Sequence, residues 1–300
     1  MRIAILSRNR FLYSTRRLLK AARLRGHEVV VGNPLQAELG IHRPLAIHLP
    51  GVTDPLPDAV LPRIGQSISD YGLAVLRQLE LLGVTAVNDH RAFSLVRDKA
   101  HTLQVLTAAG VAVPPTILTT NTSEIEAAID AVGGLPVVVK MFKGTQGVGV
   151  MRIDSVASLR SILDTMRTVG QDVLVQRYVA EAGGRDLRAV VVGGRIVAAM
   201  RRRSSGDTEF RANLHRGGSS ETARLSDADE AVVLRAVEAT GLEVAGVDVL
   251  ETREGPFVLE VNAAPGLEGI EEASGVDVAD AIVEFAEHRV GHAAASSATS

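Results

Sequence analysis

The sequence VAGVDVLETREGPFVLEVN, residues 244–262, decides the fold of this chain. It contains two apolar runs, 244–251 and 257–262, and the segment between them carries Gly255 and Pro256, which are typical turn residues. Short apolar runs separated by turn residues predict an antiparallel β-hairpin.

This hairpin brings charged side chains together. Folding it about Glu254 places Asp248 opposite Glu260. Alternation puts Asn262 on the same face, and the other face receives the apolar residues Val247, Val249, Leu259 and Val261. Because like charges that face each other destabilise a sheet, a cation is expected there. Oxygen ligands of this kind suit Mg²⁺ or Mn²⁺ shared with substrate phosphates, although a merely solvated polar face explains the hairpin alone equally well.

The residues after the hairpin favour the metal site. Residues 260–266 read EVNAAPG, and a Pro-Gly turn lets the backbone approach a ligand closely. This stretch resembles the end of the last core strand of the ATP-grasp superfamily, Glu-Val-Asn-x-x-Pro-Gly. The resemblance implies two metal ions, with Glu260 bridging both, Asn262 binding one and Asp248 binding the other.

Composition limits the classes of function. A chain of 300 residues with 46% hydrophobic and 22% charged residues indicates a globular protein of two or three domains. The net charge of −3 favours neither nucleic-acid nor membrane-surface binding. The chain has no cysteine, which excludes a thiol nucleophile and fits a cytoplasmic protein. We expect neither a signal peptide nor a membrane span, and a disordered tail over 291–300.

Residues 1–95 alternate strands and helices, which predicts an α/β domain with a parallel sheet. The first strand is followed by SRNR rather than by Gly-x-Gly-x-x-Gly, so a Rossmann-type cofactor is not expected. The ATP-grasp resemblance assigns this region to the layered domain that precedes two α+β nucleotide-binding halves. We place those halves at 96–175 and 176–290.

The first nucleotide-binding half contains a glycine-rich loop. A helix is predicted over 92–109, and an apolar strand over 137–140 ends in Lys140. The sequence KGTQGVG follows at 143–149, between two strands, and fits neither a Walker A loop nor a Rossmann loop. We interpret it as a flap whose backbone, at Gly144, Gln146 and Gly147, closes over phosphates. Lys140 supplies positive charge to those phosphates; glycines used only for turning are the alternative.

The second half begins with a hinge and ends in basic segments. In the ATP-grasp pattern the backbone of Gln176, Arg177 and Tyr178 binds the adenine edge, although the family usually has an acid where this chain has Arg177. A Gly-Gly turn at 193–194 predicts a hairpin over 185–200. The basic residues of 201–216 suit phosphoryl charge and substrate carboxylates. The assigned residues are Arg211 for phosphate, Asn213 for phosphate or metal, Arg188 for substrate or phosphate, and Arg202 and Arg216 for substrate.

Motifs along nearly the whole chain narrow the resemblance. They are MRIAILSR (1–8), PRIG (62–65), RDK (97–99), GTQGVG (144–149), FRANLHRGG (210–218) and PGLEGIE (265–271). They look like those of the ribosomal protein S6 glutamate ligases, which add glutamate to the C-terminal tail of S6, some making short poly-glutamate. The resemblance implies a cytoplasmic homo-oligomer, a tetramer, that uses ATP and two Mg²⁺ or Mn²⁺. It implies nucleotide contacts from Lys99, Lys140, Arg177, Tyr178, Asp186, Arg211 and Asn213.

The chemistry of such a ligase agrees with the residues. A carboxylate becomes an acyl donor when ATP phosphorylates it, and an amine then displaces the phosphate. Without a cysteine the intermediate is an acyl phosphate, and catalysis consists of positioning and charge neutralisation by metal, Lys140 and Arg211. Two alternatives stay open at this point: a ligase acting on a small acidic cofactor or carrier protein, and a non-catalytic nucleotide-binding regulator.

Overall fold

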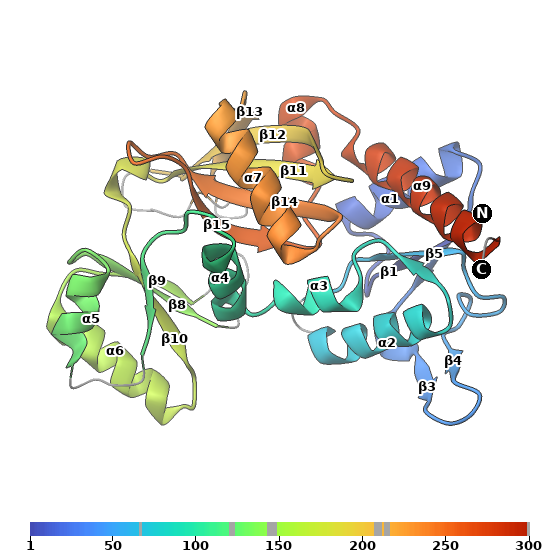
Figure 1. Cartoon of the computed structure of the whole chain (residues 1–300), viewed down its shortest axis with the longest axis horizontal. Helices are drawn as coiled ribbons and strands as arrows, with labels where there is room; N and C mark the ends of the chain where they lie inside the picture. The colour runs from blue at the N-terminus through green and yellow to red at the C-terminus, as the bar shows by residue number, and fades with distance from the viewer. Residues whose placement is uncertain (66–67, 120–123, 143–148, 207–211, 213–216, 299–300) are drawn as a thin grey trace.

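The computed structural model describes residues 1–65, 68–119, 124–142, 149–206, 212 and 217–298. They form three main sheets with helices between and around them, a fold of mixed helix and sheet content (Figure 1). Among the described residues, none of the helices combines the length and the hydropathy of a membrane span.

The N-terminal sheet has the order β2-β1-β5-β6, and its described pairs are parallel. Its elements are β1 (Arg2–Leu6), α1 (Tyr13–Leu24), β2 (Glu28–Gly32), β5 (Ala59–Pro62), α2 (Ser69–Leu81), β6 (Thr85–Ala86) and α3 (His90–Leu95). A small excursion comprises η1 (Pro34–Gln36), β3 (Glu38–Gly40) and β4 (Ala46–His48). The predicted strand–helix alternation and parallel sheet are confirmed.

The middle sheet has the order β7-β10-β8-β9 and is antiparallel. Its elements are β7 (Thr116–Leu118), α5 (Ile125–Ala131), β8 (Val137–Met141), β9 (Val150–Ile153), α6 (Val156–Thr168) and β10 (Val173–Arg177). Helices α5 and α6 pack on this sheet and form a hydrophobic core with it that is separate from the rest (Figure 1).

The C-terminal sheet has the order β13-β12-β11-β14-β15. Its elements are η4 (Ala180–Ala182), β11 (Arg185–Val192), β12 (Arg195–Arg203), β13 (Ser219–Thr222), α7 (Asp227–Thr240), β14 (Val244–Leu250), β15 (Phe257–Asn262), α8 (Glu268–Ser274) and α9 (Val278–Ala298). Both predicted hairpins, β11–β12 and β14–β15, are present.

The N-terminal and C-terminal units share their cores. Leu6 and Val60 of the first sheet belong to the same buried cluster as Val247 and Val261 of the third. A second cluster joins the first sheet to the third through α9. Because apolar surface is buried between them, the N-terminal and C-terminal units form one packed body.

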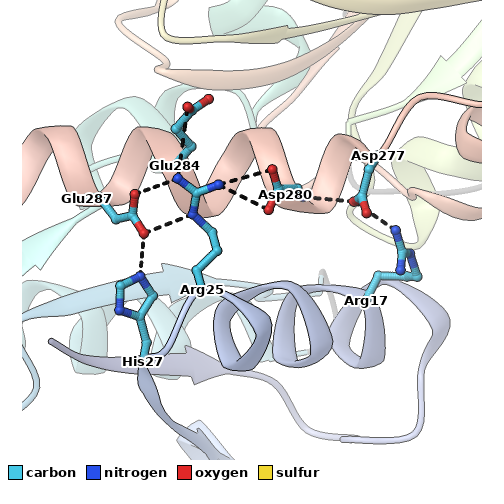
Figure 2. A network of polar contacts seen from close by, with 7 residues as sticks. All are labelled: Arg17, Arg25, His27, Asp277, Asp280, Glu284 and Glu287. Atoms are coloured by element: carbon cyan, nitrogen blue, oxygen red, sulfur yellow. Dashed lines mark hydrogen bonds and ion pairs between the residues drawn. The ribbon is translucent and has the colours of Figure 1, made fainter.

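Polar contacts also join the N-terminal unit to helix α9. Figure 2 shows Arg25, at the end of α1, reaching into acidic side chains of α9, with Nη2 2.7 Å from Glu287. His27 Nε2 lies 2.6 Å from Glu287, and Arg17 lies 2.7 Å from Asp277. Opposite charges on facing helices thus fix α9 against the N-terminal unit.

Two sequence expectations need correction. The helix expected over 92–109 is two helices, α3 and α4 (Lys99–Ala108), because the Asp98 side chain accepts the backbone N–H of His101 at 3.0 Å and starts a new helix. Helix α4 contacts α7 and β15 as well as the middle sheet, so it lies between the two halves. The disorder expected over 291–300 does not begin there: α9 continues to Ala298, consistent with the high helix propensity of its alanines.

Candidate active site

The β14–β15 hairpin has the predicted register. Asp248 pairs with Glu260, and Gly246 pairs with Asn262. The register then shifts, so that Val249 faces Val258 and Leu259 is the extra residue of a β-bulge. Leu259 was predicted to join the apolar face; this is wrong, because fully buried Val258 takes that place and Leu259 lines a pocket with Glu260.

The cation expected beside Asp248 comes from the protein itself. Arg188, directly opposite on β11, donates from Nε and Nη2 to the two carboxylate oxygens at 2.6 and 2.7 Å. Arg202 on β12 lies 3.0 Å from the same carboxylate and makes a two-point contact with Asp186 at 2.7 and 2.6 Å. Burial by itself raises the pKa of Asp248, but the two guanidinium groups outweigh it and lower the pKa to about 2.

The pairing changes the interpretation of the predicted substrate residues. Arg202 is 3% exposed, and its guanidinium is shared by Asp186 and Asp248, so it orders carboxylates rather than facing an open site. Asp186, predicted to contact nucleotide, is likewise held by Arg202. Arg188 is less buried, with an 18% exposed side chain, and its predicted contact with substrate stays a prediction.

Two lysines lie on the other side of Glu260. Lys99, from the start of α4, has Nζ 3.4 Å from Glu260 Oε1. Lys140, at the end of β8, lines the same small pocket between α4, the middle sheet and β15. Burial lowers the pKa of Lys140 to about 8, with Lys99 adding to the shift and Glu260 and Asp248 opposing it. Lys99 and Lys140, both predicted to contact nucleotide, therefore lie beside Glu260, one of the predicted metal ligands.

The residues present fit a magnesium ion shared with phosphate. Glu260 has a 41% exposed side chain whose described contact, to Lys99, is long. Asn262 Nδ2 is buried without a partner, and turning the amide over would present its oxygen, the atom that Mg²⁺ binds. Asp248 would have to share its charge with Arg188. Among the described residues no cluster of three or more acidic or histidine side chains exists, so phosphate oxygens would complete the coordination.

The sheet already uses part of the predicted adenine hinge, whose role stays a prediction. The Arg177 N–H is already donated to Pro115 O at 2.8 Å, and Gln176 lies in the ladder between β7 and β8. The Arg177 side chain makes a two-point contact with Glu254, at 2.9 and 2.6 Å, in the β14–β15 connection. The Arg177 N–H is therefore already used within the protein, and the neighbouring Tyr178 ring lies 4.7 Å from the Arg152 guanidinium carbon.

Six predicted site residues lie outside the described part of the chain. They are Gly144, Gln146 and Gly147 of the predicted flap, and Arg211, Asn213 and Arg216 of the basic segment. Their predicted roles stay predictions.

The sequence interpretation missed residues of the N-terminal unit that hold the hairpin. Buried Asn88 donates to Val244 O (2.6 Å) and Ala263 O (2.9 Å), which lie at the ends of β14 and β15. Arg63 donates to Pro265 O at 2.8 Å, and Ser14 Oγ accepts the Leu267 N–H at 3.0 Å. These contacts join positions more than 150 residues apart in the sequence. The PRIG motif (62–65) was the one sequence signal that included Arg63.

Comparison with known proteins places this site in a family. Residues 1–93 match the RimK PreATP-grasp domain and residues 96–286 match the RimK-like ATP-grasp domain. A probable alpha-L-glutamate ligase of Thioalkalivibrio sulfidiphilus is 50% identical over 96% of this chain and 95% of its own. A second one, of Shewanella sp., is 46% identical over 97% of this chain and 96% of its own.

Solved structures agree with this match. The crystal structure of a RimK domain ATP-grasp protein from Sphaerobacter thermophilus superposes with a TM-score of 0.73 at 25% identity, covering 95% of this chain and 99% of that one. The ATP-grasp ligase PsnB, solved with minimal precursor, Mg and ADP, shares the fold at 20% identity and a TM-score of 0.73, covering 97% and 98% of the two chains. The chain therefore belongs to the RimK-like ATP-grasp family of ATP-dependent ligases.

Proposed function

We propose that this enzyme joins L-glutamate to an acceptor carboxylate by an ATP-dependent peptide bond, and that the acceptor is the C-terminal tail of ribosomal protein S6. Glutamate is supported by relatives that share 46–50% identity over nearly the full chain and are named probable alpha-L-glutamate ligases. The S6 tail is supported by the family motifs of the sequence.

The observation that best supports this chemistry is that acidic and basic side chains lie close together near the end of β15. Lys99 and Lys140 approach Glu260 from one side, and Arg188 and Arg202 hold Asp248 on the other. A site that holds both carboxylates and cations in a partly desolvated place is suited to metal-bound phosphates. Lys140 and Lys99 would contact the phosphates, and Glu260 and Asn262, with Asp248, would hold Mg²⁺.

The reaction proceeds in two balanced steps. An acceptor carboxylate oxygen attacks the γ-phosphorus of ATP, forming an acyl phosphate and releasing ADP. The glutamate amine then attacks the acyl carbon, the C–O bond to phosphate breaks, and the amine proton leaves with the phosphate. Bound Mg²⁺ neutralises charge on the phosphates. The protein's own contribution is to hold the two substrates in line and to supply fixed positive charge, from Lys140 and from predicted Arg211.

The family resemblance further supports a homotetramer in the cytoplasm, able to extend its product to short poly-glutamate. Such extension needs no additional residue, because each added glutamate presents a new terminal carboxylate to the same site.

Mass spectrometry tests this proposal. Purified S6 is incubated with the enzyme, ATP, Mg²⁺ and L-glutamate, and we expect glutamyl increments on its C-terminal peptide. Glu260→Gln is the matched inactive variant, because the contact described for Glu260, to Lys99, is long at 3.4 Å and the change removes only the charge of Glu260. Unmodified S6 together with glutamylation of a small acidic acceptor would refute the S6 assignment; absence of glutamate-dependent ADP release with any acceptor would refute the ligase.

A further inference from the structure

Two partly buried arginines of the N-terminal unit, Arg63 and Arg97, have no carboxylate partner within salt-bridge distance among the described residues. Arg63 directly follows β5, at the carboxyl edge of the parallel sheet, and its described hydrogen bond is to a carbonyl, Pro265 O. Open α/β sheets bind ligands at this edge. Arg188 and Arg202 differ from Arg63, because carboxylates already occupy them.

Arg97, in the break between α3 and α4, is in a similar position. Its Nη2 donates to Gly65 O at 3.2 Å, and its Nη1 is buried without a hydrogen-bond partner. Asp70 raises the pKa of Arg97 through its field but forms no ion pair with it. Arg97 thus bonds to the short segment 63–65 that begins with Arg63, and each arginine keeps donor capacity that the described residues do not use.

Burial makes this arrangement costly. Desolvation lowers the pKa of Arg97, and it lowers the pKa of Arg63 to about 10. A buried cation without an anion destabilises a protein, and a carboxylate of a bound ligand would supply the missing charge.

Both arginines are next to the proposed reaction centre. Arg97 lies two residues before Lys99, which reaches Glu260, and Arg63 holds Pro265, three residues after Asn262. A substrate whose amine attacks an acyl phosphate at Glu260 and Asn262 would extend its remaining groups toward this edge.

We propose that Arg63 and Arg97 bind the two carboxylates of the incoming amino acid and so select an amino dicarboxylate. The inference rests on the proposed function. The amine of this substrate must stay free to react, so its carboxylates are the groups by which it is held, and a guanidinium matches a carboxylate with two parallel bonds. The assignment replaces that of Arg202, whose guanidinium is already shared by two aspartates.

Calorimetric titration of L-glutamate and L-glutamine into the enzyme saturated with AMPPNP and Mg²⁺ tests the proposal. Arg63→Met and Arg97→Met should each weaken L-glutamate binding about 30-fold, as the loss of a charge-assisted pair predicts. AMPPNP affinity should stay within about twofold. The preference for L-glutamate over L-glutamine, which lacks one carboxylate, should fall in the double variant to about unity. Arg77→Met, which removes an exposed positive charge from α2 of the same unit, should leave all affinities unchanged.

If a Met variant does not fold, Arg63→Lys and Arg97→Lys are used in its place. Each lysine keeps the positive charge but lacks the planar guanidinium group, so L-glutamate binding should weaken about fivefold or more. Variants that bind L-glutamate like the wild type would overturn the inference, as would a parallel loss of AMPPNP. Failure of the wild-type enzyme to bind L-glutamate would overturn the proposed function and this inference together, whereas normal wild-type binding with unaffected variants overturns the inference alone.

Discussion

Replacing Asp248 by asparagine should strongly destabilise the protein. The change keeps the shape of the side chain but removes the charge that compensates Arg188 and Arg202. A pKa lowered from 3.8 to about 2 corresponds to about 2 kcal/mol of stability, because one pH unit is about 1.4 kcal/mol. Leaving buried Arg202 with one carboxylate adds to this, and breaking a buried pair costs about 3–5 kcal/mol. We therefore expect a loss of about 2–5 kcal/mol in the free energy of unfolding.

Urea denaturation at pH 7 measures this difference, and Asp154→Asn is the matched control. Asp154 pairs with Arg152 at the surface, where both side chains are well exposed, so its loss should cost less than about 1 kcal/mol. An acid with a lowered pKa stabilises the fold above its unfolded pKa, and the contribution is lost as the pH falls through the folded pKa. The deficit of Asp248→Asn should therefore shrink between about pH 4 and pH 2. Equal stability of the two variants at pH 7 would refute the charge compensation described for this site.

Three further results are expected. Glu260→Gln should unfold like the wild type but lose glutamate-dependent ADP release by about two orders of magnitude or more, and near wild-type turnover would refute its proposed metal role. Because the partly buried Lys140 has a pKa lowered to about 8, the affinity of nucleotide-free enzyme for Mg-AMPPNP should fall as the pH rises through about 8. Lys140→Arg should show no such fall, and an equal fall in both would contradict the assignment. Arg25→Met should lower the free energy of unfolding at pH 7 by about 1–2 kcal/mol. The control Arg23→Met, on the exposed face of the same helix, should change it by less than about 0.5 kcal/mol. Because Glu287 has a pKa lowered to about 2, the effect of Arg25→Met should persist down to about pH 4.5 and disappear as the pH falls through about 2.

The parts of the structure predicted correctly were those set by local signals. Alternation and turn residues placed Asp248 opposite Glu260, and the Gly-Gly turn at 193–194 gave the β11–β12 hairpin. Strand–helix alternation gave the parallel N-terminal sheet. In each case the interacting residues are near one another in the sequence, so the pattern itself carries the information.

The parts that were missed depend on distant residues or on one hydrogen bond. The bulge at Leu259 shifts the register by one residue after a correct pairing, which alternation cannot detect. The like charges of the hairpin led to a metal, but Arg188 already provides the expected cation from 60 residues away. Asn88 and Arg63 act through side-chain contacts between separate units, for which a single sequence gives no periodic signal.

The acyl-phosphate step is the central claim, and isotope transfer tests it most directly. A peptide with the glutamate-ending tail of S6 is prepared with ¹⁸O in both oxygens of its C-terminal carboxylate and incubated with the enzyme, ATP, Mg²⁺ and L-glutamate. The phosphate released in the first addition to each peptide should carry one ¹⁸O, because the carboxylate oxygen that attacks ATP leaves with the phosphate. Later additions use the unlabelled carboxylate of the glutamate just joined and should release unlabelled phosphate. Phosphate without ¹⁸O from the first addition, or label recovered in AMP, would contradict the account.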